Sequence, residues 1–97
     1  MRALFLTADA LRQFKRLPRA ARPFVKEAIR KHLIEADPAH TTRNKFRLRR
    51  VSEHADYELR AEPWRVFYRI EPGRVLVTLI GEKRGEKLLV EGEEVKL

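Results

Sequence analysis

The segment from Lys45 to Glu82 constrains the fold most strongly, because apolar and charged residues alternate along nearly all of it. Alternation with a period of two is typical of strands that bury one face and expose the other. The segment divides into the stretches KFRLRRV, DYELRA, WRVFYRIE and RVLVTLIGE. The short connections AEP and EPG join the last three stretches, so the pattern predicts a meander of antiparallel strands.

Two helices are expected before this meander. Thr7 or Asp9 can cap a first helix, which the sequence KRLP ends at Pro18. Pro23 fits the first turn of a second helix, where its missing N–H has no intrahelical partner to lose. Apolar residues then recur at helical spacing from Val25 to Ala36, and charged residues take the opposite side.

The expected fold class is α+β, with this helical hairpin packed on one face of a twisted antiparallel sheet. RALFLT, residues 2–7, predicts an opening strand, and the tail GEKLLVEGEEVKL predicts one more short strand or hairpin. A chain of 97 residues is long enough for one core, so residues 1–97 are expected to form a single domain.

Period-two alternation assigns the strand residues to two faces. The face expected to contact the helices collects the apolar members: Phe46, Leu48, Tyr57, Leu59, Trp64, Val66, Tyr68 and Ile70. The opposite face collects mostly arginines: Arg47, Arg49, Glu58, Arg60, Arg65, Phe67 and Arg69. Because helices on one side of an antiparallel sheet leave the other side open, these arginines form either a solvated face or a surface that binds phosphates.

The charge of the chain favours a polyanionic partner. It has 22 Lys and Arg against 14 Asp and Glu, which gives a net charge of +8. Such a domain tends to contact nucleic acid, an acidic protein or an anionic membrane surface. Arginine binds phosphate through two hydrogen bonds, and an exposed ring can stack on an unpaired base. The candidate nucleic-acid-binding residues are Lys45, Arg47, Arg49, Phe67 and Arg69.

Several functional classes are disfavoured. The chain has no cysteine, which excludes disulfides, thiolate catalysis and cysteine-ligated zinc. The few histidines lack metal-ligand spacing and the glycines form no nucleotide fingerprint, so we expect neither metal nor cofactor. No stretch approaches the roughly 20 apolar residues of a membrane span, and we expect a cytoplasmic protein without membrane contact.

The stretch YELRAEPWRVFYRIEPGRVLVTLIGEKR resembles the RelE/ParE superfamily, the toxin halves of type II toxin–antitoxin pairs. Its pattern is Leu-Arg, a short turn, Arg-Val-x-Tyr-Arg-Ile, a hydrophobic strand, and a glycine followed by basic residues. The resemblance extends over nearly the whole chain, and it implies an opening strand, a helical hairpin and a four-stranded meander.

The resemblance implies two activities. RelE-like members are endoribonucleases that cut mRNA on the ribosome and inhibit translation, whereas ParE-like members inhibit DNA gyrase by protein contact. In the RelE-like case Arg60 and Arg65 would hold the scissile phosphate, Lys83 and Arg84 would add charge, and Glu58 would act as general base. A third alternative is a stand-alone domain that binds RNA or protein without toxicity. Either toxin would have a cognate antitoxin as its partner.

This chain departs from RelE at two places. The positions that align with the catalytic lysines of RelE fall near Asp56 and Glu58, so the charge there is inverted. Leu89 lies about where RelE has a C-terminal tyrosine. Related ribonucleases use a carboxylate base with arginine, so Glu58 stays compatible with catalysis. The proton donor is unassigned, with His54 as a possible substitute.

Overall fold

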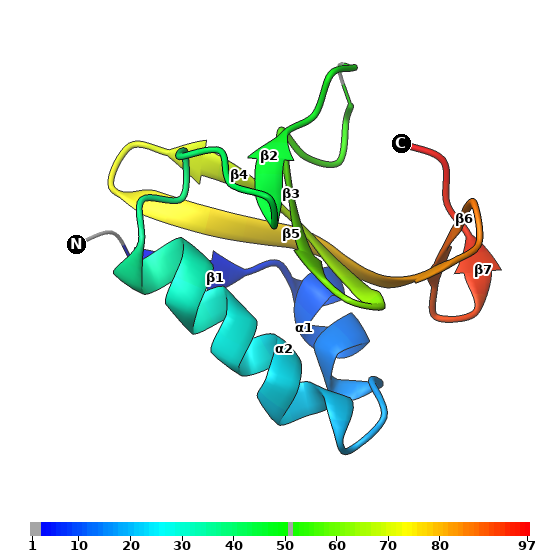
Figure 1. Cartoon of the computed structure of the whole chain (residues 1–97). Coiled ribbons are helices and arrows are strands. Elements are labelled where there is room, and N and C mark those ends of the chain that lie inside the picture. Colours follow the sequence, from blue (N-terminus) through cyan, green and yellow to red (C-terminus); the bar gives the residue numbers. More distant parts are fainter. Residues whose placement is uncertain (1–2, 51) are drawn as a thin grey trace.

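The computed structural model describes residues 3–50 and 52–97, which form two helices and a seven-stranded sheet (Figure 1). The helices are α1, Ala8–Lys15, and α2, Ala21–Ile29, which continues as a π-helical segment, η1, Arg30–Glu35. The strands are β1 Ala3–Leu6, β2 Lys45–Arg47, β3 Tyr57–Ala61, β4 Trp64–Glu71, β5 Arg74–Arg84, β6 Lys87–Val90 and β7 Glu93–Glu94. Two residues that were expected in strands, Arg2 and Val51, lie outside the described part.

The sheet has the order β2-β3-β4-β5-β6-β7, and each neighbouring pair is antiparallel. Strand β1 lies off this path and pairs with the first half of β5 in parallel. The second half of β5 pairs with β6, so the two halves of this long strand have different neighbours. The predicted α+β class and antiparallel meander are confirmed, and the tail supplies the expected hairpin as β6 and β7.

Both helices cover the same face of the sheet (Figure 1). Thr7 starts α1 as expected, because its hydroxyl accepts a hydrogen bond from the Ala10 N–H at 3.1 Å. The main core between helices and sheet contains Val25, Ile29, Leu33, Leu59, Val66, Tyr68, Val75, Val77 and Ile80, among others. Within it the Tyr68 hydroxyl donates to the Pro38 carbonyl at 2.8 Å, and burial raises the pKa of Tyr68 above its ordinary value. The predicted helix-facing side of β4 is therefore confirmed.

Strand β2 is turned over relative to the prediction. Lys45 pairs with Leu59 and is 1% exposed, whereas Phe46 pairs with Glu58 on the opposite face. Leu48 packs against a second apolar cluster, away from the helices. The expectation that Phe46 and Leu48 contact the helices was wrong, because a lysine takes the inward position.

The buried Lys45 completes the end of the second helix. Its amino group donates to the carbonyl oxygens of His32 at 2.6 Å and Asp37 at 2.7 Å. The last carbonyls of a helix have no intrahelical donor, so a buried cation here satisfies groups that would otherwise be unpaired. Burial lowers the pKa of Lys45, and its aliphatic stem occupies space in the protein interior.

The sheet face opposite the helices is partly covered by the chain itself. A β-bulge between Phe67 and Tyr68 shifts the register of β4 against β5. Beside it lies the second apolar cluster, formed by Ala55, Phe67, Leu79, Leu88 and Val90, with Leu48, Val95 and Leu97 packed against it. Phe67 is 2% exposed, so the expectation of an exposed base-stacking ring was wrong. The C-terminal tail supplies the covering residues.

Gly81 allows β6 to approach β5 closely. A Cβ atom at this position would lie 2.7 Å from the Leu89 carbonyl oxygen and 3.0 Å from side-chain atoms of Leu88 and Val90. We expect Gly81→Ala to lower the free energy of unfolding by about 1–3 kcal/mol, because backbone would have to move. Urea denaturation measures this effect. Gly85→Asn is the control, since nothing lies within 4 Å of a Cβ there and asparagine tolerates its φ of +58°; an equal loss in both variants would contradict the expectation.

Candidate functional site

Three of the predicted catalytic residues meet where β3 pairs with β4. Arg60 lies directly opposite Arg65, and Glu58 lies two residues before Arg60 on β3. The Nε atoms of both arginines are 3.3 Å from the same oxygen, Oε2 of Glu58. The carboxylate is therefore placed between two guanidinium groups, as the period-two pattern predicted.

Arg65 is held more tightly than Arg60. The Arg65 side chain is 7% exposed, against 47% for Arg60. Its Nη1 donates to the Trp64 carbonyl at 3.0 Å and its Nη2 donates to Glu62 at 3.0 Å. The Nε–H of Arg65 is buried and has no hydrogen-bond partner, although Glu58 is near. Because this atom is buried and lies beside the Glu58 carboxylate, the ion pair with Glu58 is the contact that it makes in the folded protein.

Glu58 and Arg65 border a groove of about 440 Å³ on the side of the sheet away from the helices, whereas Arg60 lines a separate hollow beside α2. Its polar walls include Glu58, Arg65 and Lys83, and its floor is apolar and includes Phe67 and Leu88. The remaining lining residues are Leu48, Arg50, Glu86, Glu94, Val95, Lys96 and Leu97. The groove therefore joins one buried carboxylate–arginine pair to further side chains of both charges.

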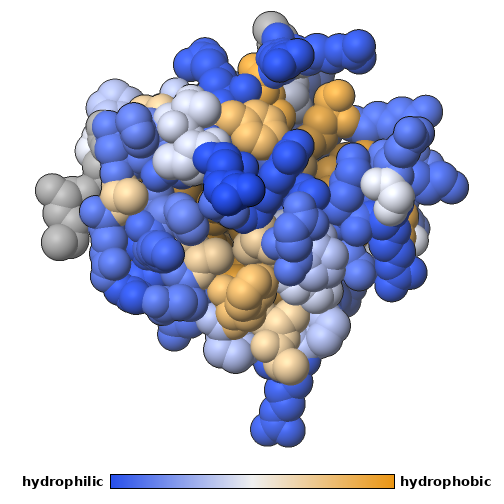
Figure 2. Space-filling view, viewed as in Figure 1, coloured by the Kyte–Doolittle hydropathy of each residue, from blue (hydrophilic) through white to orange (hydrophobic). Residues whose placement is uncertain are grey.

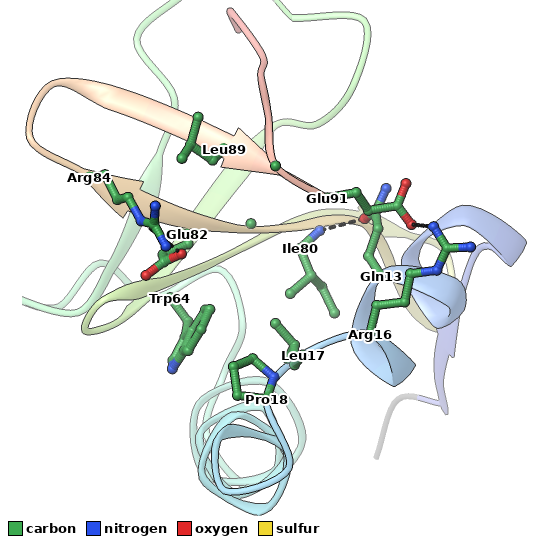
Figure 3. Close-up of a pocket in the computed structure, with 12 residues that line it drawn as sticks. Gln13, Arg16, Leu17, Pro18, Trp64, Ile80, Glu82, Arg84, Leu89 and Glu91 are labelled. Carbon is green, nitrogen blue, oxygen red and sulfur yellow. Dashed lines mark hydrogen bonds and ion pairs between the residues drawn. The ribbon is translucent and has the colours of Figure 1, made fainter.

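The predicted basic pair after the glycine is divided between the two faces of β5. Lys83 lines the groove, and its amino group lies 3.4 Å from the Glu86 carbonyl oxygen. Arg84 lines a different hollow, where its Nε lies 3.2 Å from Glu82 (Figure 3). Adjacent strand residues point to opposite faces, so Arg84 does not join Glu58 and Lys83.

Two of the arginines proposed to bind nucleic acid lie away from this groove. Arg47 pairs with Tyr57 and lies over its ring at 5.6 Å, and Tyr57 itself packs against the main core. The expectation that Arg47 shares a sheet face with Glu58 was therefore wrong, because Phe46 takes the position opposite Glu58. Arg49 is exposed but lies beyond the end of β2, in the connection to β3.

The side chains of the other three nucleic-acid candidates are buried or half-buried and make contacts within the protein. Lys45 is buried in the interior, so its predicted contact with a surface ligand was wrong. Arg69 is half-buried and donates to the Glu53 carbonyl, which ties the β2–β3 connection to β4. Phe67 lies in the groove floor. Figure 2 shows that hydrophilic residues nevertheless cover most of the visible face, with apolar patches between them.

The groove residues contributed by the tail were not predicted from the sequence. Glu94, Val95, Lys96 and Leu97 form one wall, and the Val95 N–H donates to the Leu88 carbonyl at 2.9 Å. Alternation in EEVKL indicated a strand, but a pattern so short does not specify which surface it covers. His54 is exposed and is not among the groove-lining residues.

Comparison of the chain with known proteins found no relative. Across the described residues, no three His, Cys, Asp or Glu side chains gather as metal ligands. The helices in the same part of the chain are all too short or too polar to cross a membrane. No family model, no curated protein and no solved structure matches the chain.

Proposed function

We propose that this protein is a RelE-type toxin, a ribosome-dependent endoribonuclease that cuts mRNA and stops translation. The observation that carries the proposal is the Glu58 carboxylate, 3.3 Å from the Nε atoms of both Arg60 and Arg65 at the edge of a groove. A base beside two cations supplies two of the three requirements for cleaving RNA through its own 2′-hydroxyl, and the third is a donor that protonates the leaving oxygen.

The chemistry assigns a role to each of these groups. Glu58 takes the proton of the ribose 2′-hydroxyl, whose oxygen attacks the adjacent phosphorus. Arg65 and Arg60 bind the phosphate oxygens as negative charge accumulates. The leaving 5′-oxygen takes a proton from Lys83, which lines the same groove. Arg84 has no catalytic role in this scheme, because it lines another hollow.

The proposed partners follow from the same surface. An antitoxin would neutralise the protein by placing an acidic or amphipathic segment across the arginine-bearing face. Messenger RNA on the ribosome would be the substrate, and the cytoplasm would be the site of action. The net charge of +8 supports attraction to both partners.

One observation favours the second candidate, a ParE-type inhibitor that contacts DNA gyrase without catalysis. Glu58 already pairs with two arginines, as a carboxylate in a purely structural ion cluster would. Under this alternative the arginines stabilise the β3–β4 pair and the function depends on surface contacts. A non-toxic binding domain would share the same arrangement.

The test is pulse-labelling after controlled induction in a bacterial host. We expect methionine incorporation to fall before thymidine incorporation, and Arg65→Ala to restore methionine incorporation because the phosphate loses its buried cation. Arg74→Ala is the matched control, since Arg74 is an exposed arginine that pairs with Glu71 in the β4–β5 turn.

The order of the two effects separates the candidates. A fall in thymidine incorporation first would favour the gyrase inhibitor. Unchanged incorporation of both methionine and thymidine would favour a binding domain without toxicity. Circular dichroism of Arg65→Ala shows whether the variant is folded, so that lost activity is not confused with lost structure.

A further inference from the structure

A second hollow, of about 300 Å³, lies on the helix side of the sheet, away from the groove. It is bordered by the end of α1, the α1–α2 connection, the start of β4 and the hairpin of β5 and β6 (Figure 3). Of the predicted catalytic residues, Arg84 lies here. None of the proposed chemistry uses this hollow.

The floor of the hollow is apolar and aromatic. Leu17 and Ile80 are buried, and the Trp64 side chain is partly exposed beside Pro18. The buried Gln13 accepts a hydrogen bond from the Ile80 N–H at 2.8 Å, which ties α1 to β5 under the hollow. An indole and aliphatic groups on rigid elements form a surface on which a flat ring can lie.

The rim carries two arginines, each paired with a glutamate. Arg16 is 3.3 Å from Glu91, and Arg84 is 3.2 Å from Glu82. The arginine side chains are 64% and 68% exposed. Exposed ion pairs are weak, so an incoming phosphate can replace a carboxylate at little cost. The released Glu82 carboxylate is an acceptor for N–H groups on the edge of a base, whereas Glu91 stays paired with Arg12 at 2.9 Å.

We propose that this hollow binds a nucleotide, with its base against Trp64 and its phosphate on Arg16 or Arg84. An apolar aromatic floor, cations for phosphate and a carboxylate for base N–H groups are the three contacts that a nucleotide requires. The ligand is either a free nucleotide or one residue of an RNA strand. The site goes beyond the proposed nuclease function and does not require Glu58 or Arg65.

The two sites share one end of the sheet. Trp64 and Arg65 are neighbours in β4, and Lys83 and Arg84 are neighbours in β5, and each pair sends one side chain to each site. Strand β4 faces β5 here, with Trp64 opposite Glu82. An RNA strand in the groove would need to pass around the β3–β4 turn to reach the hollow.

Tryptophan fluorescence tests the proposal, because Trp64 is the only tryptophan in the chain. We expect guanosine monophosphate to change the fluorescence saturably, since guanine offers N–H donors to a carboxylate and its ring can cover the indole. Ribose 5-phosphate should bind far more weakly because it lacks the base. A short single-stranded oligonucleotide is the third ligand: binding of the oligonucleotide without binding of the mononucleotide assigns the site to RNA.

Variants decide whether the signal comes from this hollow. Of Arg16→Gln and Arg84→Gln, the variant that removes the arginine holding the phosphate should weaken the apparent Kd about tenfold, as expected for the loss of one hydrogen bond to a charged group, and the other should change it little. Arg19→Gln is the control, because Arg19 is exposed in the same connection but does not line the hollow. Lys96→Gln should leave the titration unchanged, because Lys96 is exposed and lines the groove but not the hollow.

Three results would overturn the proposal. The first is an absence of any saturable change with the mononucleotide and the oligonucleotide. The second is equal binding of ribose 5-phosphate and guanosine monophosphate, which would remove the base contact. The third is loss of the signal in Lys96→Gln with no effect of Arg16→Gln or Arg84→Gln, which would place the ligand in the groove.

Discussion

Under the proposed nuclease function, Glu58→Gln is expected to slow ribosome-dependent mRNA cleavage by about 100-fold or more, the usual contribution of a general base. Glutamine keeps the size of the side chain and removes its ability to take a proton. At the same time RNA affinity should stay equal or rise, because the carboxylate that lies 3.3 Å from Arg60 and Arg65 would no longer compete with phosphate. Single-turnover cleavage with purified ribosomes and a separate RNA-binding titration measure the two effects.

Glu62→Gln is the matched control for this experiment. Glu62 also pairs with Arg65, at 3.0 Å, but its side chain is 71% exposed and does not line the groove. Cleavage should therefore change little in Glu62→Gln. Full translation arrest by Glu58→Gln would contradict a catalytic role and favour inhibition by contact. A joint fall in cleavage and RNA binding would instead indicate that Glu58 only holds the arginines in position.

Lys45→Met is expected to lower the free energy of unfolding by about 3–5 kcal/mol, because two hydrogen bonds from a charged donor are lost. Methionine fills similar space, but the carbonyls of His32 and Asp37 lose the donor that lies 2.6 and 2.7 Å from them. For a domain of this size the melting temperature should fall by more than about 12 °C. Thermal denaturation followed by circular dichroism measures the change.

Lys31→Met is the control for Lys45→Met. Lys31 lies in the same helical segment, η1, and is exposed, so its replacement should change the stability only slightly. An equally stable Lys45→Met protein would show that the apolar environment offsets the lost hydrogen bonds. That result would assign the buried lysine a role other than closing the helix end.

Periodicity predicted the fold where one face of an element contacts a large core. The helices and the strands β3, β4 and β5 were predicted from spacing alone, since their apolar residues repeat at 3.6 or 2 residues. The Glu58–Arg60–Arg65 cluster followed from the same rule, because residues two apart share a face and a short turn places the next strand beside it. These relations are local, so they depend little on the rest of the molecule.

Periodicity did not predict the placement of residues that hydrogen-bond or pack with groups distant in the sequence. Lys45 points inward because backbone carbonyls eight and thirteen residues away need a donor. Phe67 is buried because the tail packs over the face that was expected to be open. In both cases a partner distant in sequence determines the orientation, and no pattern within the strand contains that information.

The sequence by itself determined the α+β class, the antiparallel meander and the common sheet face of one carboxylate and two arginines. Only the tertiary structure decided that the tail forms a wall of the groove, that Lys83 lines it, and that Arg84 belongs to a separate hollow. The physical reason is the range of the interactions. Strand alternation is set by neighbouring residues, whereas a groove is formed by segments that meet only after the chain has folded.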